Sequence, residues 1–339
     1  MSKKNSSVKF KNFFTESKDL FKIFQNFKNK LDHLKKKNYT IAVSGGPDSL
    51  ALVALTKAYS CTKKTSFHYV LIDHNIRKNS AKEARQVKDL LKKKKINLKI
   101  ILNKRNITRN IQGQARNTRY EILSNYCKRN KIKTLLTAHN LEDQVETFFI
   151  RLSRGSGLKG LSAMKSLSQI DNKINLYRPL LDTKKKTLIK ISKGVFGKYF
   201  KDPSNKNYKY LRTKVRNLKK PLEKSGIEYE QIIKSIKNLA LSKATLDGYF
   251  KEIFKNVITA NKKEIIVNYK QFKKLNNEVK IAVINSSIKK LKKNYYDPRS
   301  KKVSNLISNI KKRNFKKATL GGCVFILKNE NLCLKIEKT

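Results

Sequence analysis

The chain has 339 residues, with 80 lysines and arginines against 24 acidic residues, and its formal net charge is +56. The length suits two or three domains, and 39% hydrophobic residues are enough for a globular core. The charge favours a polyanionic partner, above all a nucleic acid, and no apolar run is long enough to predict a membrane span. Four scattered cysteines lack the spacing of a zinc or iron–sulfur site, so we predict a cytoplasmic protein with reduced thiols.

Lysine and arginine are distributed differently along the chain. Lysine occurs throughout, which indicates in part a compositional bias of the source, whereas twelve of the fourteen arginines lie between Arg77 and Arg216. The guanidinium group binds phosphate through a planar fork of donors, which the lysine ammonium lacks. The arginine-rich part of the chain is therefore the better guide to contacts with phosphate or RNA.

The first 37 residues predict an amphipathic helix that packs on the body of the protein. The apolar positions of this helix are Phe14, Leu20, Phe21, Phe24, Phe27 and Leu31.

A small polar loop follows a β-branched run at 39–43 and precedes an apolar helical stretch at 50–58. The loop consists of Ser44, Gly45, Gly46, Pro47, Asp48 and Ser49. Its glycines allow a tight turn, and the helix N-terminus supplies free N–H groups and a positive dipole, so the loop predicts a phosphate site. Asp48 can cap the helix or hold a metal. The spacing fits neither the Walker loop nor the dinucleotide loop, but it resembles the SGGxDS loop of the N-type ATP pyrophosphatases.

Strand and helix patterns alternate up to about residue 152. Strands are predicted at 39–43, 67–72, 98–102 and 134–138, and helices at 80–95, 112–130 and 140–152. This alternation predicts an α/β fold with a doubly wound parallel sheet. Ligands of such sheets bind at the carboxyl ends of the strands, where Asp73, His74 and His139 are expected beside the Ser44–Ser49 loop.

Acidic side chains gather on the helix predicted at 140–152. His139, Glu142, Asp143 and Glu146 are spaced so that they share one helical face. The opposite, apolar stripe comprises Val145, Phe148, Phe149 and Leu152. The carboxylates can bind Mg²⁺, attract an ammonium group or act as a general base, and their residue types alone leave these roles open.

The second half of the chain is more helical and richer in lysine. A turn-rich break occurs at Asp202–Asn205. Helices are predicted at 279–290 and 303–310, followed by a β-hairpin of 319–327 and 332–336. We therefore expect a helical segment at 1–37, a catalytic domain at 38–220, and a mainly helical, RNA-binding region at 221–339 that ends in a short α+β segment.

Together these motifs resemble the tRNA(Ile)-lysidine synthetases, a family of PP-loop ATP pyrophosphatases. The resemblance runs in order over about residues 38–220. It includes the Ser44–Ser49 loop, Asp73-His74-x-x-Arg77, Gln114-Ala115-Arg116 to Arg119-Tyr120, His139 to Thr147, Arg151 to Leu158, Arg178-Pro179-Leu180-Leu181, Asp202–Asn205 and Arg212 to Arg216.

The resemblance implies a reaction on the wobble cytidine of a tRNA(Ile) with a CAU anticodon. ATP adenylates the C2 oxygen of the base, and free L-lysine then displaces AMP to give lysidine. The implied cofactors are ATP and Mg²⁺, and the implied partners are that tRNA and lysine, without a membrane. Family members are often homodimers, and the residues of this chain do not decide its oligomeric state.

The resemblance also implies roles for individual residues. The residues implied to bind ATP are the six residues of the Ser44–Ser49 loop together with Asp73 and His74. The residues implied to bind Mg²⁺ are Asp48 and Asp143. The implied catalytic residues are His139, Asp143, Glu146 and Arg119. The arginines expected to bind tRNA or to complete the pocket are Arg77, Arg116, Arg151, Arg154, Arg212 and Arg216. Glu142 stands where the family usually has aspartate, so it is a weaker candidate than Asp143.

Three other functions compete with this prediction. A 2-thiocytidine synthetase is expected to need paired cysteines, and the C-x-x-C spacing is missing here. GMP and NAD synthetases do not need an arginine-rich catalytic half. A non-enzymatic RNA-binding protein would explain the charge but neither the Ser44–Ser49 loop nor the acidic helix face. ATP consumption that depends on tRNA would separate an enzyme from such a binder.

Overall fold

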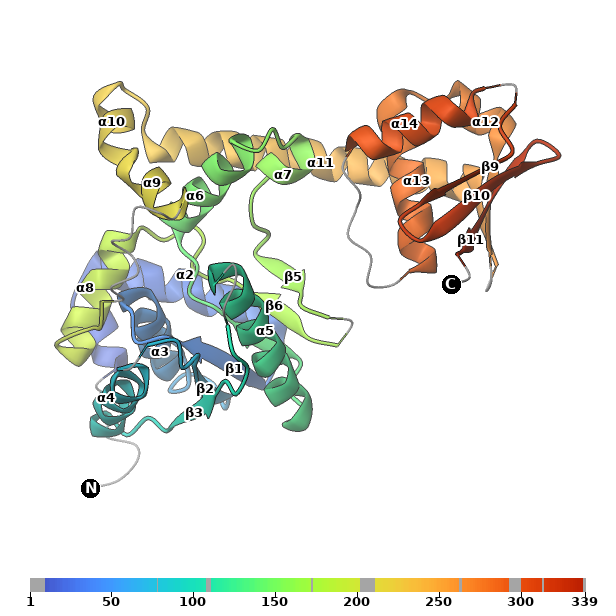
Figure 1. The fold of residues 1–339 in the computed structure, drawn as a ribbon. Coiled ribbons are helices and arrows are strands. Elements are labelled where there is room, and N and C mark those ends of the chain that lie inside the picture. Colours follow the sequence, from blue (N-terminus) through green and yellow to red (C-terminus); the bar gives the residue numbers. More distant parts are fainter. Residues whose placement is uncertain are drawn as a thin grey trace. The chain divides into compact units, whose positions relative to one another are not determined.

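The computed structural model describes residues 10–77, 79–107, 111–171, 173–201, 211–261, 264–292, 300–312 and 314–337 (Figure 1). The chain divides into two compact units, residues 1–239 and 240–339. The predicted break at Asp202–Asn205 lies outside the described residues. The domain limits expected at 37 and 220 stay a prediction.

A six-stranded sheet forms the centre of the described part of the first unit. Its order is β3 (Leu98–Leu102), β2 (Ser66–Asp73), β1 (Asn38–Val43), β4 (Thr134–Leu136), β6 (Asn175–Tyr177) and β5 (Leu167–Gln169). All neighbouring pairs are parallel except β5 with β6. The predicted doubly wound α/β sheet is thus confirmed, and the chain reverses its winding direction between β1 and β4, where such sheets bind ligands.

Helices cover both faces of this sheet (Figure 1). On one face lie α2 (Lys18–Leu34), α3 (Pro47–Tyr59), α4 (Ser80–Lys93) and α8 (Lys185–Phe196), and on the other lies α5 (Ile111–Arg129). Side chains alternate along each strand, so Tyr39, Ile41 and Val43 of β1 all enter the core on the α3 side. This packing holds the C-terminal end of β1, and the loop that follows it, in a fixed place.

The N-terminal amphipathic helix is confirmed as α2, with two differences. Phe14, predicted on this helix, lies before it in a separate helical segment of residues 10–15. Leu20, Phe24, Phe27 and Leu31 are buried, but Phe21 is 45% exposed.

A further layer of the first unit consists of α6 (Leu141–Leu152), α7 (Leu158–Leu161), α9 (Leu211–Asn217), α10 (Lys219–Lys224) and the start of α11 (Tyr229–Val257). Val145 of α6 and three isoleucines of α11 share its small core, whereas Leu152, predicted on the apolar stripe, is exposed.

The second unit contains, in its described residues, a five-stranded antiparallel sheet. Its order is β7 (Ile258–Ala260), β8 (Glu264–Asn268), β11 (Asn331–Ile336), β10 (Cys323–Lys328) and β9 (Lys317–Leu320). The sheet packs with α12 (Tyr269–Lys274), α13 (Asn277–Leu291) and α14 (Ser300–Ile310). The predicted single strand at 319–327 is wrong, because Gly321 and Gly322 both have positive φ and turn the chain between β9 and β10.

Candidate active site

The Ser44–Ser49 loop connects β1 to the N-terminus of α3. Gly45 has a φ of +78°, and its carbonyl accepts a hydrogen bond of 3.0 Å from the N–H of Phe200. Ser49 Oγ donates to the Gly46 carbonyl at 3.0 Å and accepts from the Ser44 N–H at 3.2 Å. Gly46 is the N-cap of α3 and gives the helix no side-chain cap. The first turn therefore presents its N–H groups and positive dipole to the loop, as an anion site requires.

Asp48 lies in the first turn of α3 with a buried carboxylate. Its Oδ1 atom accepts no hydrogen bond from any described residue. Burial raises the pKa of Asp48 to about 6, and the charges of Asp143 and Glu142 add to this shift while Lys185 opposes it. A buried carboxylate oxygen that accepts no hydrogen bond is costly unless a cation binds it. Asp48 and Asp143 therefore fit Mg²⁺, which typically takes one or two carboxylates together with substrate phosphates. The described residues contain no cluster of three or more metal-binding side chains.

The end of β2 supplies a second part of the site. Asp73 is buried, and its Oδ1 accepts a hydrogen bond of 2.9 Å from the N–H of Asn75, which has positive φ. His74 Nε2 accepts from Arg119 Nε at 3.2 Å. Burial lowers the pKa of His74 to about 4, and the Arg119 charge contributes to that shift. His74 is therefore neutral at pH 7 and carries its proton on Nδ1, a buried atom without a partner among the described residues.

The predicted acidic helix is confirmed as α6, but His139 precedes it. Asn140 is the N-cap: its side chain accepts from the Asp143 N–H at 2.9 Å, and Asp143 Oδ2 accepts from the Asn140 N–H at 3.1 Å. This capping box fixes the Asp143 side chain. His139 Nδ1 lies 2.9 Å from Thr137 Oγ1, and burial lowers the pKa of His139 to about 4. His139 is thus neutral at pH 7.

The three carboxylates of α6 have different partners. Glu142 Oε2 accepts a hydrogen bond of 2.8 Å from the N–H of Lys185, the first residue of α8. Glu146 accepts from Arg212 Nε at 2.8 Å and from Arg216 Nε at 2.6 Å. Asp143 Oδ1 lies 3.6 Å from Arg212 Nη2. Of the three, Asp143 is the carboxylate that shares the surroundings of both Asp48 and the arginines of α9.

The remaining predicted arginines occupy several environments. Arg77 pairs with Glu83 at 2.9 Å, and Arg116 lies over the Tyr120 ring at 5.1 Å. Arg151 Nη1 donates to the carbonyls of Gly160 and Ala163, at 2.7 and 2.9 Å, and so anchors α7. Arg154 is exposed just after α6. The structure therefore brings Arg212 and Arg216 to the carboxylates directly, whereas their roles and those of the other arginines stay predictions.

Sequence reasoning missed two residues of this region. The charge of Lys185 lowers the pKa of Asp48, and Asn140, which caps α6, lowers it as well. The pattern Asn140-x-x-Asp143 is a signature of a helix start and could have revealed the cap. The sequence held no comparable signal for Lys185, because it is one of three consecutive lysines.

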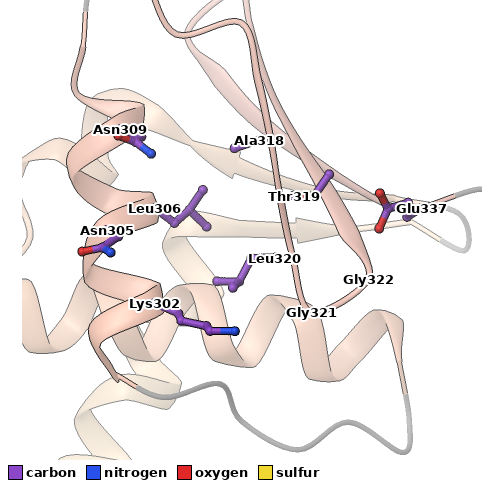
Figure 2. Close-up of a pocket in the computed structure, with 10 residues that line it drawn as sticks. All are labelled: Lys302, Asn305, Leu306, Asn309, Ala318, Thr319, Leu320, Gly321, Gly322 and Glu337. Atoms are coloured by element: carbon purple, nitrogen blue, oxygen red, sulfur yellow. The ribbon is translucent and has the colours of Figure 1, made fainter.

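Two cavities lie outside this carboxylate network. One, of about 400 Å³, opens at the ends of β2 and β3 and is lined by His74, Asn75, Ile76 and residues 102–107. The other, of about 390 Å³, lies in the second unit between α14 and the Gly321–Gly322 turn (Figure 2). Its polar lining includes Lys302, Asn305 and Asn309 of α14. The second unit has 24 basic and seven acidic residues over 240–339, which favours an anionic partner.

The fold and the loop define the class of protein. The family described as the PP-loop domain matches residues 18–222, and a solved U34-tRNA thiolase, NcsA from Methanococcus maripaludis, has a similar fold. Its TM-score is 0.55 at 20% identity, covering 65% of this chain and 78% of that one. The chain is thus a PP-loop protein that uses ATP.

Curated relatives narrow this class to one family. The tRNA(Ile)-lysidine synthase of Wolbachia pipientis wMel is 33% identical over 317 residues, which cover 92% of this chain and 73% of that protein. The protein of the same name from Orientia tsutsugamushi (strain Boryong) is 40% identical over 202 residues, 58% of this chain and 45% of that protein. This chain belongs to the tRNA(Ile)-lysidine synthase family. Within the described ranges, no helix is both long and apolar enough to cross a membrane.

Proposed function

We propose that this enzyme joins the amine of free L-lysine to C2 of the wobble cytidine in a tRNA(Ile) with a CAU anticodon. ATP is split into AMP and diphosphate in the process, and the product is lysidine. The observation that carries this proposal is the coincidence of family membership with an uncapped helix N-terminus next to a carboxylate–arginine network. A thiolation reaction is not favoured, because its expected cysteine pairs are missing.

The first step needs the α-phosphorus of ATP next to the C2 oxygen of cytidine. The N–H groups of α3, with Ser44 and Ser49, would hold the diphosphate that leaves. Mg²⁺, where bound, would be held by Asp48 and Asp143 and would neutralise phosphate charge. His74, neutral and anchored by Arg119, would donate its Nδ1–H toward the nucleotide, and the Asp73 carboxylate would accept a hydrogen bond from the nucleotide.

The second step needs a neutral amine, because only the unprotonated nitrogen has a lone pair for attack on C2. The bond from nitrogen to C2 forms as the bond from C2 to the AMP oxygen breaks, and one proton leaves the nitrogen. Asp143 is fixed by the capping box, so it would bind the ammonium group and take this proton. His139 and Glu146 are further candidates for this proton transfer.

The direct test uses the purified protein with an unmodified CAU-anticodon tRNA(Ile) transcript, ATP, Mg²⁺ and labelled lysine. Mass spectrometry of the digested RNA should show lysidine at the wobble position. AMP release without lysine incorporation would point to another nucleophile. Binding of tRNA without either product would favour a non-enzymatic RNA-binding protein.

A homodimer and the domain limits at 37 and 220 stay predictions. Sedimentation would test the homodimer, and limited proteolysis would test the domain limits.

The basic second unit is proposed to bind the tRNA through its phosphates. Lys302 lines the cavity of Figure 2. Its neighbour Lys301 is exposed, as Lys302 is, but does not line that cavity. Replacing Lys302 with Gln should weaken tRNA binding. The fall of the logarithm of the association constant with the logarithm of salt concentration should become less steep by about one, since one phosphate contact is lost. Filter binding between low and moderate salt would measure this. The matched Lys301→Gln variant should change the slope less, and equal slopes would contradict a specific contact at this cavity.

A further inference from the structure

Glu146 is the most enclosed carboxylate of the acidic helix. It is only 3% exposed, and each of its two oxygens accepts a hydrogen bond from a different arginine. The distances are 2.6 Å from Arg216 Nε to Oε1 and 2.8 Å from Arg212 Nε to Oε2. Both arginines belong to the seven-residue helix α9, and each is about one third exposed or less. Glu146 thus ties α9 to α6.

This arrangement limits what Glu146 can do. Glu146 is buried between the two arginines, so a lysine ammonium could reach the remaining lone pairs of its oxygens only if an arginine moved away. Such a move would break a buried, charge-assisted pair, which is costly. Asp143, by contrast, contacts Arg212 only at 3.6 Å. The carboxylate available to an amine is therefore Asp143.

The same arrangement makes the arginines suited to an anion. Two guanidinium groups bind the Glu146 carboxylate through their Nε atoms, and the second carboxylate, Asp143, lies farther from Arg212, at 3.6 Å. The clamp through Nε fixes both side chains, which reduces the entropy that an anion would otherwise have to offset on binding. The charges of Glu146, Asp143 and Asp48 raise the pKa of Arg216, so its guanidinium lies within electrostatic range of a residue of the Ser44–Ser49 loop.

We propose that Glu146 is a positioning residue, which holds Arg212 and Arg216 so that they bind the phosphate of the adenylated cytidine. This inference rests on the proposed function, since it names the group of that reaction which the arginines contact. It assigns Glu146 to the adenylation step and separates it from lysine binding. The ligand class is a phosphate ester at the reaction centre, not an amine.

The test separates the two steps of the reaction with a Glu146→Gln variant of the full chain. Adenylation is followed without lysine, as diphosphate release that depends on the CAU-anticodon tRNA. We expect at least a tenfold loss in this step, whereas the KM for lysine in the residual overall reaction stays within about twofold of the wild-type value. Normal adenylation with a strongly raised KM for lysine would overturn the inference and return Glu146 to amine binding. Lysidine formation by the wild type, measured in parallel, tests the proposed function independently.

A comparison of combined variants tests whether Glu146 acts through the arginines. If it does, adding Glu146→Gln to the Arg212→Gln, Arg216→Gln pair should cost little further adenylation activity. A further loss of tenfold or more would contradict a purely positioning role. Should Glu146→Gln fail to fold, Arg216→Gln alone must show the same split, with adenylation impaired and the KM for lysine kept. A raised KM for lysine with normal adenylation in that variant would refute the assignment.

Discussion

Replacing Asp143 with Asn should abolish lysine transfer while the protein stays folded. The amide keeps an oxygen that can accept from the Asn140 N–H, so the capping box of α6 can persist. It cannot take a proton or attract an ammonium group. The loss of a general base typically costs about 10²–10⁴-fold in rate. The measurement is lysidine formation by mass spectrometry under single-turnover conditions.

The control for this variant is its midpoint temperature of thermal unfolding. This temperature should stay within a few degrees of the wild-type value, since a helix cap contributes about 1 kcal/mol. Normal lysidine formation by Asp143→Asn would exclude Asp143 as base and as ammonium ligand. A variant that unfolds early would instead show that the carboxylate is needed for the capping box, and Asp143→Ser, which keeps a capping oxygen, would then decide the chemical role.

Replacing Gly45 with Ala should remove ATP-dependent activity and destabilise the first unit. Gly45 has a φ of +78°, and an added Cβ would lie 2.5 Å from Val87 Cγ2 and 3.3 Å from Phe200 Cδ2. The left-handed backbone costs about 1 kcal/mol for alanine, and overpacking typically adds about 1–3 kcal/mol. The chain can relieve this clash only by moving the loop away from α4 and residue 200, which would displace the N–H groups of α3. Diphosphate release and the midpoint of urea unfolding would measure both effects.

Gly46 provides a matched control in the same loop. Its φ is −71°, and the nearest atom to an added Cβ is Ser44 Oγ at 3.6 Å, an ordinary contact. Gly46→Ala should therefore fold with stability close to the wild type and lose much less activity than Gly45→Ala. Equal losses in the two variants would mean that close approach of ATP to the loop, and not the conformation of Gly45, sets the requirement for glycine.

The comparisons with known proteins show the family that the short sequence motifs had predicted. The Ser44–Ser49 loop and the Asn140–Glu146 segment are each encoded within a few residues, because a helix N-terminus and a helical face are local structures. The same locality explains why the four strands β1 to β4 of the doubly wound sheet were predicted correctly. The short strands β5 and β6, of three residues each, were missed, since so few residues carry no periodic signal.

Side-chain partners far apart in the sequence were beyond such reasoning. Glu146 meets Arg212 and Arg216 across 66 and 70 residues, and Glu142 meets the N–H of Lys185 across 43. Helical spacing placed the three carboxylates of α6 on one face, but it could not say which would face an arginine, a helix N-terminus or a substrate. Those partners depend on how α8 and α9 pack on the first unit.

The class of fold and the family could be read from the sequence alone, because they rest on local backbone geometry and on the order of short motifs. Packing assigns the three carboxylates of α6 different partners: Glu142 accepts from the start of α8, Glu146 binds two arginines, and the charge of Asp143 acts on Asp48. The physical reason is that a carboxylate's role depends on the charges and donors packed around it, and packing joins residues that the sequence keeps apart.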